Sequence, residues 1–264
     1  MEKTIVLRDN VSVSYEEYPQ NKKANLVFIH GNSLDKSSFR YQKDVEANLY
    51  FLDLIGHGNS SHSEDPAENY NLLFYGELVA DFIQKKELKN VILVGHSLGG
   101  HVAIHSLEFS TEIEGLFLFG TPPIRLPPNM PEAFLPSEIG GLFYQADISR
   151  EQAMAMASLL DSEDAANEIV SSILNTDPNC RSHLLASVGE GKIRNEVDIL
   201  QSTQIKTFLG IGAKDRLVNR AYLNSLMDLN LFEHRIHEFD AGHCPQLTNP
   251  SAFNSLLNQF IAHF

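Results

Sequence analysis

The sequence predicts an α/β fold, in which helices cover both faces of a mostly parallel sheet and a helical segment is inserted. Three observations favour it. Strand-like apolar runs alternate with helical windows along most of the 264 residues, a pattern typical of parallel strands joined by crossover helices. The apolar run 91–94 passes through a Gly-His-Ser-Leu-Gly turn directly into a helical pattern. Between 121 and about 205 the alternation gives way to prolines and then helical windows.

The first part of the chain predicts four strands and one long helix. Runs 4–7 and 11–15 are separated by Arg8-Asp9-Asn10, which predicts a hairpin because these residues favour turns. Runs 25–29 and 49–54 are mostly apolar, as buried strands are. Residues 70–87 carry apolar side chains at helical spacing, which predicts an amphipathic helix that covers the sheet.

The same alternation continues to the end of the chain. Strands are predicted at 91–94, 115–119, 207–211 and 235–239, and helices at 101–109, around Tyr222 and at 252–264. Helices between successive strands favour parallel pairing. We therefore expect residues 1–124 and 201–264 to form one core domain.

Residues 125–200 are expected to form a helical lid. Six prolines between 122 and 136 predict a rigid exit from the sheet. Helical windows follow at 150–160 and 164–174. Met154 and Met156 in the first window either pack the lid or form an adaptable wall for an acyl chain, and the sequence leaves both interpretations open.

Ser97 is the candidate nucleophile. A serine on a sharp strand-to-helix turn exposes its hydroxyl at the end of the sheet, and flanking glycines make such a turn possible. The following helix directs its free N–H groups and positive dipole end toward the same place. A hydroxyl is a weak nucleophile at neutral pH, so it needs a base, usually a histidine held by a carboxylate.

Asp215 and His243 are the candidate partners of Ser97. Asp215 follows the strand at 207–211, and His243 follows the strand at 235–239. Both therefore belong at the carboxyl ends of strands, where ligands bind in open α/β sheets. The chain order serine, aspartate, histidine is the one that this turn motif requires. Asp240 is the alternative carboxylate for His243.

Two backbone amides are expected to hold the oxyanion. Asn32 lies in the loop after the strand at 25–29, and Leu98 follows the nucleophile. Fixed N–H donors at these places stabilise negative charge on an attacked carbonyl oxygen. Ser33 in the same loop and His96 beside the nucleophile are candidate substrate contacts, although His96 suits a packing role equally well.

Composition narrows the class of protein. The formal net charge of −14 argues against nucleic acid or an anionic membrane surface as a partner. No run of 18 apolar residues is present, and residues 1–10 lack the apolar core of a signal peptide. Two cysteines, Cys180 and Cys244, give no disulfide framework. We expect a cytoplasmic enzyme that acts on a small molecule, and the sequence leaves its oligomeric state open.

Four features together resemble the α/β-hydrolase superfamily over nearly the whole chain. They are the His30-Gly31 loop, the turn at 95–99, Asp215 and His243. The resemblance implies the α/β-hydrolase fold with a helical lid, and a catalytic triad of serine, histidine and aspartate.

Three shorter motifs resemble the N-acyl-homoserine lactonases of this fold. They are residues 29–33 followed by Phe39, residues 120–123, and Thr176-Asp177 in the lid. This resemblance implies a metal-independent, cofactor-free serine hydrolase that opens the lactone of quorum-sensing molecules, an activity called quorum quenching. Those lactonases contact the lactone with a lid tyrosine. Rough alignment places Met156 at that position, so Met156 is a candidate substrate contact.

Other functions share this pattern. Dehalogenases and epoxide hydrolases of the superfamily use an aspartate nucleophile, and Ser97 argues against both. A carbon–carbon bond hydrolase or an aminopeptidase would use the same triad, and a peptidase needs an acidic anchor for the substrate amine, such as Glu138, Asp147 or Glu151. A ligand receptor that retains the hydrolase fold is the non-enzymatic alternative.

Overall fold

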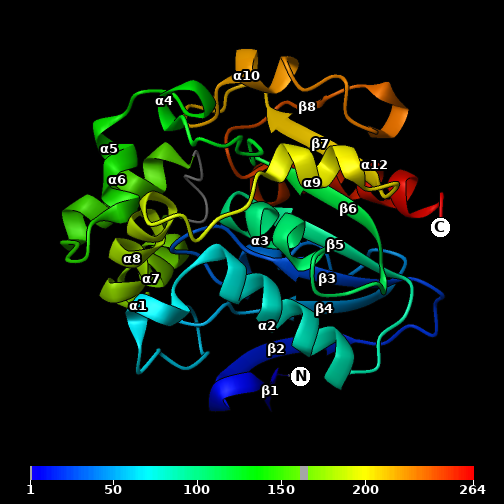
Figure 1. The fold of residues 1–264 in the computed structure, drawn as a ribbon, viewed down its shortest axis with the longest axis horizontal. Helices are drawn as coiled ribbons and strands as arrows, with labels where there is room; N and C mark the ends of the chain where they lie inside the picture. Colours follow the sequence, from blue (N-terminus) through cyan, green and yellow to red (C-terminus); the bar gives the residue numbers. More distant parts are fainter. Residues whose placement is uncertain (1, 161–165) are drawn as a thin grey trace.

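A computed structural model describes residues 2–160 and 166–264 and contains an eight-stranded sheet (Figure 1). The strands are β1 Glu2–Val6, β2 Ser12–Tyr18, β3 Asn25–Ile29, β4 Asn48–Leu52, β5 Val91–His96, β6 Ile113–Phe119, β7 Lys206–Gly212 and β8 His237–Phe239. Their spatial order is β1-β2-β4-β3-β5-β6-β7-β8. The pairs β1–β2 and β2–β4 are antiparallel, and every pair from β4 to β8 is parallel. The predicted mostly parallel sheet is therefore confirmed.

The central strands β3, β5 and β6 are largely apolar because both faces of the sheet are covered there. In β3, Val27 and Ile29 join the apolar cluster on one face, whereas Leu26 and Phe28 join the cluster on the other. All four side chains are fully buried. Successive residues of a strand point to opposite faces, so a strand buried on both sides needs an unbroken apolar run.

Helices lie on both faces, as predicted (Figure 1). One face is covered by α2 Leu72–Lys85, α3 Leu98–Ser106, α9 Glu196–Ser202 and α10 Arg220–Asn224. The other is covered by α12 Pro250–Ile261, with the short α11 Pro245–Thr248 and η2 Lys36–Phe39 beside it. None of the helices in the described ranges combines the length and the apolar character that crossing a bilayer requires.

Five helices between β6 and β7 gather beside the sheet, at the left of Figure 1. They are α4 Met130–Ala133, α5 Glu138–Gly141, α6 Arg150–Leu159, α7 Ala166–Asn175 and α8 Pro178–Gly189. Several of their apolar side chains form a third cluster together with Leu34, Cys244 and Leu247 of the core, whereas Cys180 and Leu184 of α8 join the cluster that contains α2 and α3. Helix α6 matches the predicted window 150–160, and α7 matches the second window from residue 166 onward, residues 164 and 165 being outside the described residues. The division into a core and a lid at 125–200 stays a prediction.

The last strand is shorter than the predicted run 235–239. The predicted run begins directly after a 3-10 turn, η4 Phe232–His234. In this turn Glu233 and His234 have φ values of 53° and 55°. A left-handed backbone cannot continue a strand; the chain is extended again at Arg235, and its pairing with β7 begins at His237. The remaining short elements are η1 Arg8–Asn10, α1 Pro66–Asn69 and η3 Leu142–Tyr144.

Candidate active site

Ser97 lies on the turn between β5 and α3. Its backbone has φ 50° and ψ −116°, a strained conformation for a residue with a side chain, which the surrounding structure must hold in place. Its N–H donates to the Phe119 carbonyl at 3.0 Å, and the Thr121 hydroxyl donates to its carbonyl at 2.9 Å. A Cβ on Gly99 would lie 2.0 Å from the Ile29 carbonyl oxygen. Only glycine therefore permits this approach of α3 to β3.

Asp215 and His243 form a buried pair beyond the ends of β7 and β8. His243 Nδ1 lies 2.7 Å from Asp215 Oδ2, and the two side chains are 2% and 0% exposed. The N–H groups of Leu217 and Val218 donate to Asp215 Oδ1 at 2.8 and 3.1 Å. Because the carboxylate accepts from Nδ1, the other ring nitrogen, Nε2, is the one left to act as a base.

The environment of Asp215 keeps it ionised. Burial raises the pKa of its carboxyl, but the charge of His243 and hydrogen bonds from the ring and two backbone amides outweigh burial, so the pKa lies below its usual value. Asp240, the alternative carboxylate, is exposed and pairs with Lys214 at 2.9 Å. The structure therefore places Asp215, rather than Asp240, against His243.

Ser97 and His243 line one cavity. The ring of His243 packs on Gly120, which has a φ of +61° and where a Cβ would lie 2.9 Å from His243 Cε1. Ser97 Oγ makes no hydrogen bond to any residue in the ranges 2–160 and 166–264. Catalytic hydrogen bonds of unliganded enzymes are often long or misaligned and tighten when substrate binds.

The two amides predicted for the oxyanion lie near Ser97. Asn32 borders the same cavity, and Leu98 borders a smaller adjoining one. Neither backbone N–H donates to another group of the described chain. The side chain of Asn32 is already engaged, because its Nδ2 donates to the Phe143 carbonyl at 2.9 Å. Asn32 thus ties the loop after β3 to the lid segment and leaves its backbone N–H available.

Ser33 differs from its predicted role as a substrate contact. It is fully buried and does not line the cavity. Its N–H donates to His57 Nε2 at 3.2 Å, and its hydroxyl donates to Asn32 Oδ1 at 3.1 Å. With φ at 59°, it turns the chain behind Asn32. Ser33 therefore supports Asn32 from behind instead of facing a ligand.

His96 borders the cavity but also supports His243. Its ring stacks on Phe119 with centroids 4.8 Å apart, and its Nε2 lies 2.9 Å from the His243 carbonyl oxygen. Burial and the nearby His243 hold the pKa of His96 well below the usual value. The neutral ring can then donate from Nε2 to this carbonyl, which helps to fix the loop that carries His243.

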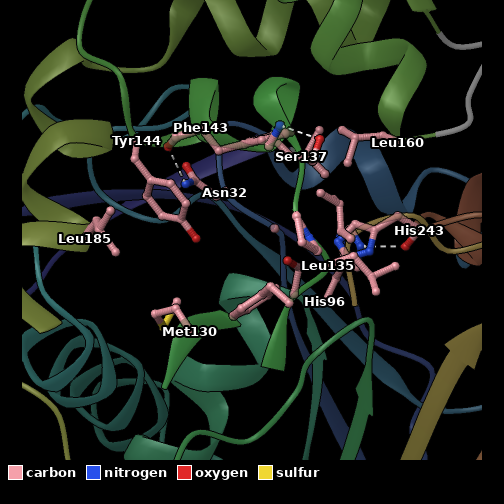
Figure 2. A pocket seen from close by; sticks show the side chains of 18 of the residues that line it. Asn32, His96, Met130, Leu135, Ser137, Phe143, Tyr144, Leu160, Leu185 and His243 are labelled. Carbon is pink, nitrogen blue, oxygen red and sulfur yellow. Dashed lines mark hydrogen bonds between the residues drawn. The ribbon is translucent and has the colours of Figure 1, made fainter. Parts of the chain in front are cut away.

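The cavity has a volume of about 340 Å³ and apolar walls, within the range of sites for small organic ligands. Most of the wall opposite the core comes from the lid segment (Figure 2). The apolar lid residues labelled there are Met130, Leu135, Phe143, Tyr144, Leu160 and Leu185.

Met156 does not form this wall, contrary to the prediction. It is fully buried within the lid cluster, because α6 turns this side chain toward the lid interior. Met154, two residues earlier, is 58% exposed. Of the two interpretations of these methionines, the structure supports lid packing for Met156.

Sequence reasoning missed Tyr144. It lies in the 3-10 turn η3, where no periodic pattern distinguishes it, and its ring borders the cavity (Figure 2). Burial raises the pKa of its phenol, so the hydroxyl is neutral. A tyrosine hydroxyl therefore faces the site from a lid segment other than the one expected.

The sequence profile of the "Alpha/beta hydrolase family" matches residues 26–256. The chain belongs to this family. The match includes Ser97, Asp215 and His243, and it runs through the lid segment as well as the core.

Solved structures of alpha/beta hydrolases resemble the whole chain. One is the N-acyl homoserine lactonase AidH in complex with N-butanoyl homoserine, which has a TM-score of 0.93 at 25% identity and covers 99% of this chain and 96% of that one. An esterase from Rhodococcus shares the fold with a TM-score of 0.82 at 18% identity, over 99% and 98% of the two chains. The predicted resemblance to these lactonases is thus confirmed.

Curated relatives match over shorter stretches. "Putative esterase/lipase 1" of Mycoplasma pneumoniae is 37% identical over 125 residues, which are 44% of this chain and 45% of that protein. The "Putative esterase/lipase 2" of the same organism is 37% identical over 90 residues, a third of each chain. The chain thus spans less than half the length of these relatives.

Proposed function

We propose that this alpha/beta hydrolase cleaves carboxylic ester or lactone bonds, with Ser97 as nucleophile, His243 as base and Asp215 as the orienting carboxylate. The observation that carries the proposal is the buried Asp215–His243 pair, 2.7 Å apart, at the wall of the cavity that Ser97 also lines. An imidazole held by a carboxylate beside a hydroxyl is the arrangement that makes the hydroxyl reactive. A ligand receptor would gain nothing from burying a carboxylate against an imidazole there.

The reaction proceeds in two halves. Ser97 Oγ attacks the carbonyl carbon while its proton moves to His243 Nε2, and Asp215 stabilises the resulting imidazolium. The amides of Asn32 and Leu98 stabilise the oxyanion, each by roughly 3 kcal/mol. The carbon–oxygen bond to the leaving group then breaks, and the alkoxide takes the proton from His243. Water repeats the sequence on the acyl-enzyme and releases the acid.

The lid at 125–200 is proposed to cover the site and select the substrate. Its side chains supply the apolar walls that suit an alkyl or aryl group. The acidic residues considered as a peptidase anchor, Glu138, Asp147 and Glu151, are all exposed, and none lines the cavity. This favours a neutral ester or lactone over an amino-terminal peptide.

The decisive variant is Ser97→Ala, measured on p-nitrophenyl butanoate. We expect kcat to fall by at least about 10³-fold, because the nucleophile is removed while the oxyanion amides remain. Ser137→Ala is the matched control, because Ser137 lines the same cavity and its hydroxyl oxygen accepts from the Gly140 N–H, away from Asp215 and His243 in the sequence. Equal activity of Ser97→Ala and the wild type would refute the assignment.

We propose N-acyl-homoserine lactones as the first substrates to test. The likeness to AidH over 99% of the chain supports this choice, as does the phenol of Tyr144 at the cavity wall. In a lactone the leaving alkoxide stays tethered, so the product is one ring-opened acid. Base titration should show kcat/KM for N-butanoyl homoserine lactone above that for a linear methyl ester of similar size. If the enzyme cleaves linear esters but does not open the lactone, the proposed esterase activity would stand and the proposed lactonase activity would be refuted.

A further inference from the structure

A second, narrower cavity of about 80 Å³ opens beside Ser97. The two cavities meet along the residues Asn32, Ser97, Met130, Phe134, Tyr144 and Leu185. His243 borders only the larger cavity. Figure 2 shows Met130, Tyr144 and Leu185, which border both, on the side of the site opposite His243. The small cavity therefore extends from Ser97 away from His243.

The place of His243 decides which part of an ester enters which cavity. This step rests on the proposed function. The leaving alkoxide must take its proton from His243, so the alcohol part lies in the larger cavity that His243 borders. The acyl part must then extend the other way, into the small cavity beside the Leu98 amide. At about 80 Å³ against about 340 Å³ for its neighbour, the small cavity suits a short acyl chain with only a few non-hydrogen atoms beyond the carbonyl.

One wall of this small cavity is formed by His101, which contacts the buried carboxylate of Glu196. His101, one turn along α3 from Ser97, borders the cavity, and its Nδ1 lies 2.8 and 3.0 Å from the two carboxylate oxygens of Glu196. Glu196 is fully buried, accepts from the Ile124 N–H at 2.7 Å and lies 3.3 Å from His105 Nε2. Burial raises the pKa of Glu196, but the two histidines lower it to about 2, so the carboxylate is ionised.

The other nitrogen of His101 is left for a ligand. His101 is only 8% exposed, and its Nε2 makes no hydrogen bond to any residue that the structure describes. The neighbours of His101 around this cavity are largely apolar, among them Ile124, Leu184 and Val188. A polar group in such surroundings favours a partner that can form a hydrogen bond with it. Four residues of helix rise about 6 Å, which is within reach of a substituent on a short acyl chain.

We propose that the small cavity is an acyl subsite in which His101, held by Glu196, binds a hydroxyl group on the third carbon of a short acyl chain. A hydroxyl both donates and accepts, so it pairs with Nε2 in either protonation state of the ring. A carboxylate at the same place would lie close to the ionised Glu196, which disfavours it. Among linear esters, whose acyl and alcohol parts can enter separate cavities, the subsite thus selects 3-hydroxyacyl esters of about four carbons.

The test compares p-nitrophenyl 3-hydroxybutanoate with p-nitrophenyl 3-methylbutanoate, whose acyl groups have the same number of non-hydrogen atoms. We expect the wild type to prefer the hydroxyl ester by about tenfold in kcat/KM, the effect of one buried hydrogen bond. His101→Leu should abolish this preference, which a purely structural role for His101 would leave unchanged.

Two further variants keep the test valid if His101→Leu fails to fold. Val188→Phe narrows the small cavity while keeping both side chains of the His101–Glu196 pair, and it should raise the ratio of acetate to 3-methylbutanoate turnover about tenfold. Leu135→Phe, on the wall of the larger cavity only, is the matched control and should change selectivity for the alcohol part instead.

The outcomes separate the two proposals. Hydrolysis without any preference for the hydroxyl ester, unchanged in His101→Leu, would overturn the subsite and leave the ester hydrolase intact. A preference for a succinyl ester over both substrates would overturn the hydroxyl class. Failure of the folded wild type to hydrolyse any ester would overturn both proposals.

Discussion

The two sides of the cavity are built in different ways. On the core side, Ser97, Asp215 and His243 each follow a strand, and backbone hydrogen bonds fix their places. On the lid side, Phe143 and Tyr144 come from a single 3-10 turn between short helices. The difference teaches that this fold holds its candidate chemistry on the sheet, whereas the opposite wall comes from the predicted lid segment, whose apolar cluster also includes Leu34, Cys244 and Leu247 of the core.

The largest loss of activity is expected from a change on the core side. Asp215→Asn keeps the shape of the side chain but removes the charge that holds the proton on His243 Nδ1. We expect kcat on p-nitrophenyl butanoate to fall by about 10⁴-fold with little change in the circular dichroism spectrum. Asp240→Asn, on the exposed alternative carboxylate, should stay within about twofold of the wild type. A loss below tenfold for Asp215→Asn would mean that His243 is not the base.

The fixed backbone of the core side makes the second prediction. Gly120→Ala would place a Cβ 2.9 Å from His243 Cε1 at a φ of +61°, so the ring must move. We expect kcat to fall by about 10²-fold, the usual consequence of a displacement near 1 Å. Gly191→Ala is the matched control, because it has a φ of +78° but nothing within 4 Å of the added carbon. Equal losses of kcat in Gly120→Ala and Gly191→Ala would show that backbone strain, and not contact with the His243 ring, causes the loss.

The same contrast explains what the sequence could predict. Strand ends can be recognised from apolar runs, and parallel strands bring their carboxyl ends to one edge, so Ser97, Asp215 and His243 could be located without coordinates. Ser33 was misplaced because a loop residue can turn either way. Its buried bonds to His57 and Asn32 depend on contacts that no local pattern encodes.

The lid resisted prediction for a physical reason. Met154 and Met156 are equally apolar, and only the packing of α6 against its neighbours decides which is buried. Tyr144 lies in a turn without periodicity. The pair His101–Glu196 joins residues 95 positions apart. Periodicity reports the face of one element, whereas these placements depend on how several elements meet.

The lid side makes the third prediction. The buried Arg181 guanidinium donates to the lid carbonyls of Gln145, Ala146, Ile173 and Thr176 at 2.6 to 3.3 Å. Arg181→Met would leave these acceptors without their donor and should cost about 3 kcal/mol of unfolding free energy. Urea unfolding measures the loss. If the lid is the less rigid side, Arg181→Met should raise KM by a larger factor than it lowers kcat. A larger effect on kcat would mean that Arg181 stabilises the core side of the cavity instead.

The smallest effect is expected inside the lid, at Met156. Met156→Leu nearly conserves volume at a fully buried position, so it should cost less than about 1.5 kcal/mol of unfolding free energy. The ratio of kcat/KM for ethyl and hexyl butanoate should not change, because Met156 does not border the cavity. Leu160→Met, on the cavity wall itself, should change this ratio severalfold. If Met156→Leu changed the ratio more than Leu160→Met, the lid would have to repack around substrate, and Met156 would regain the acyl-wall role that its burial now argues against.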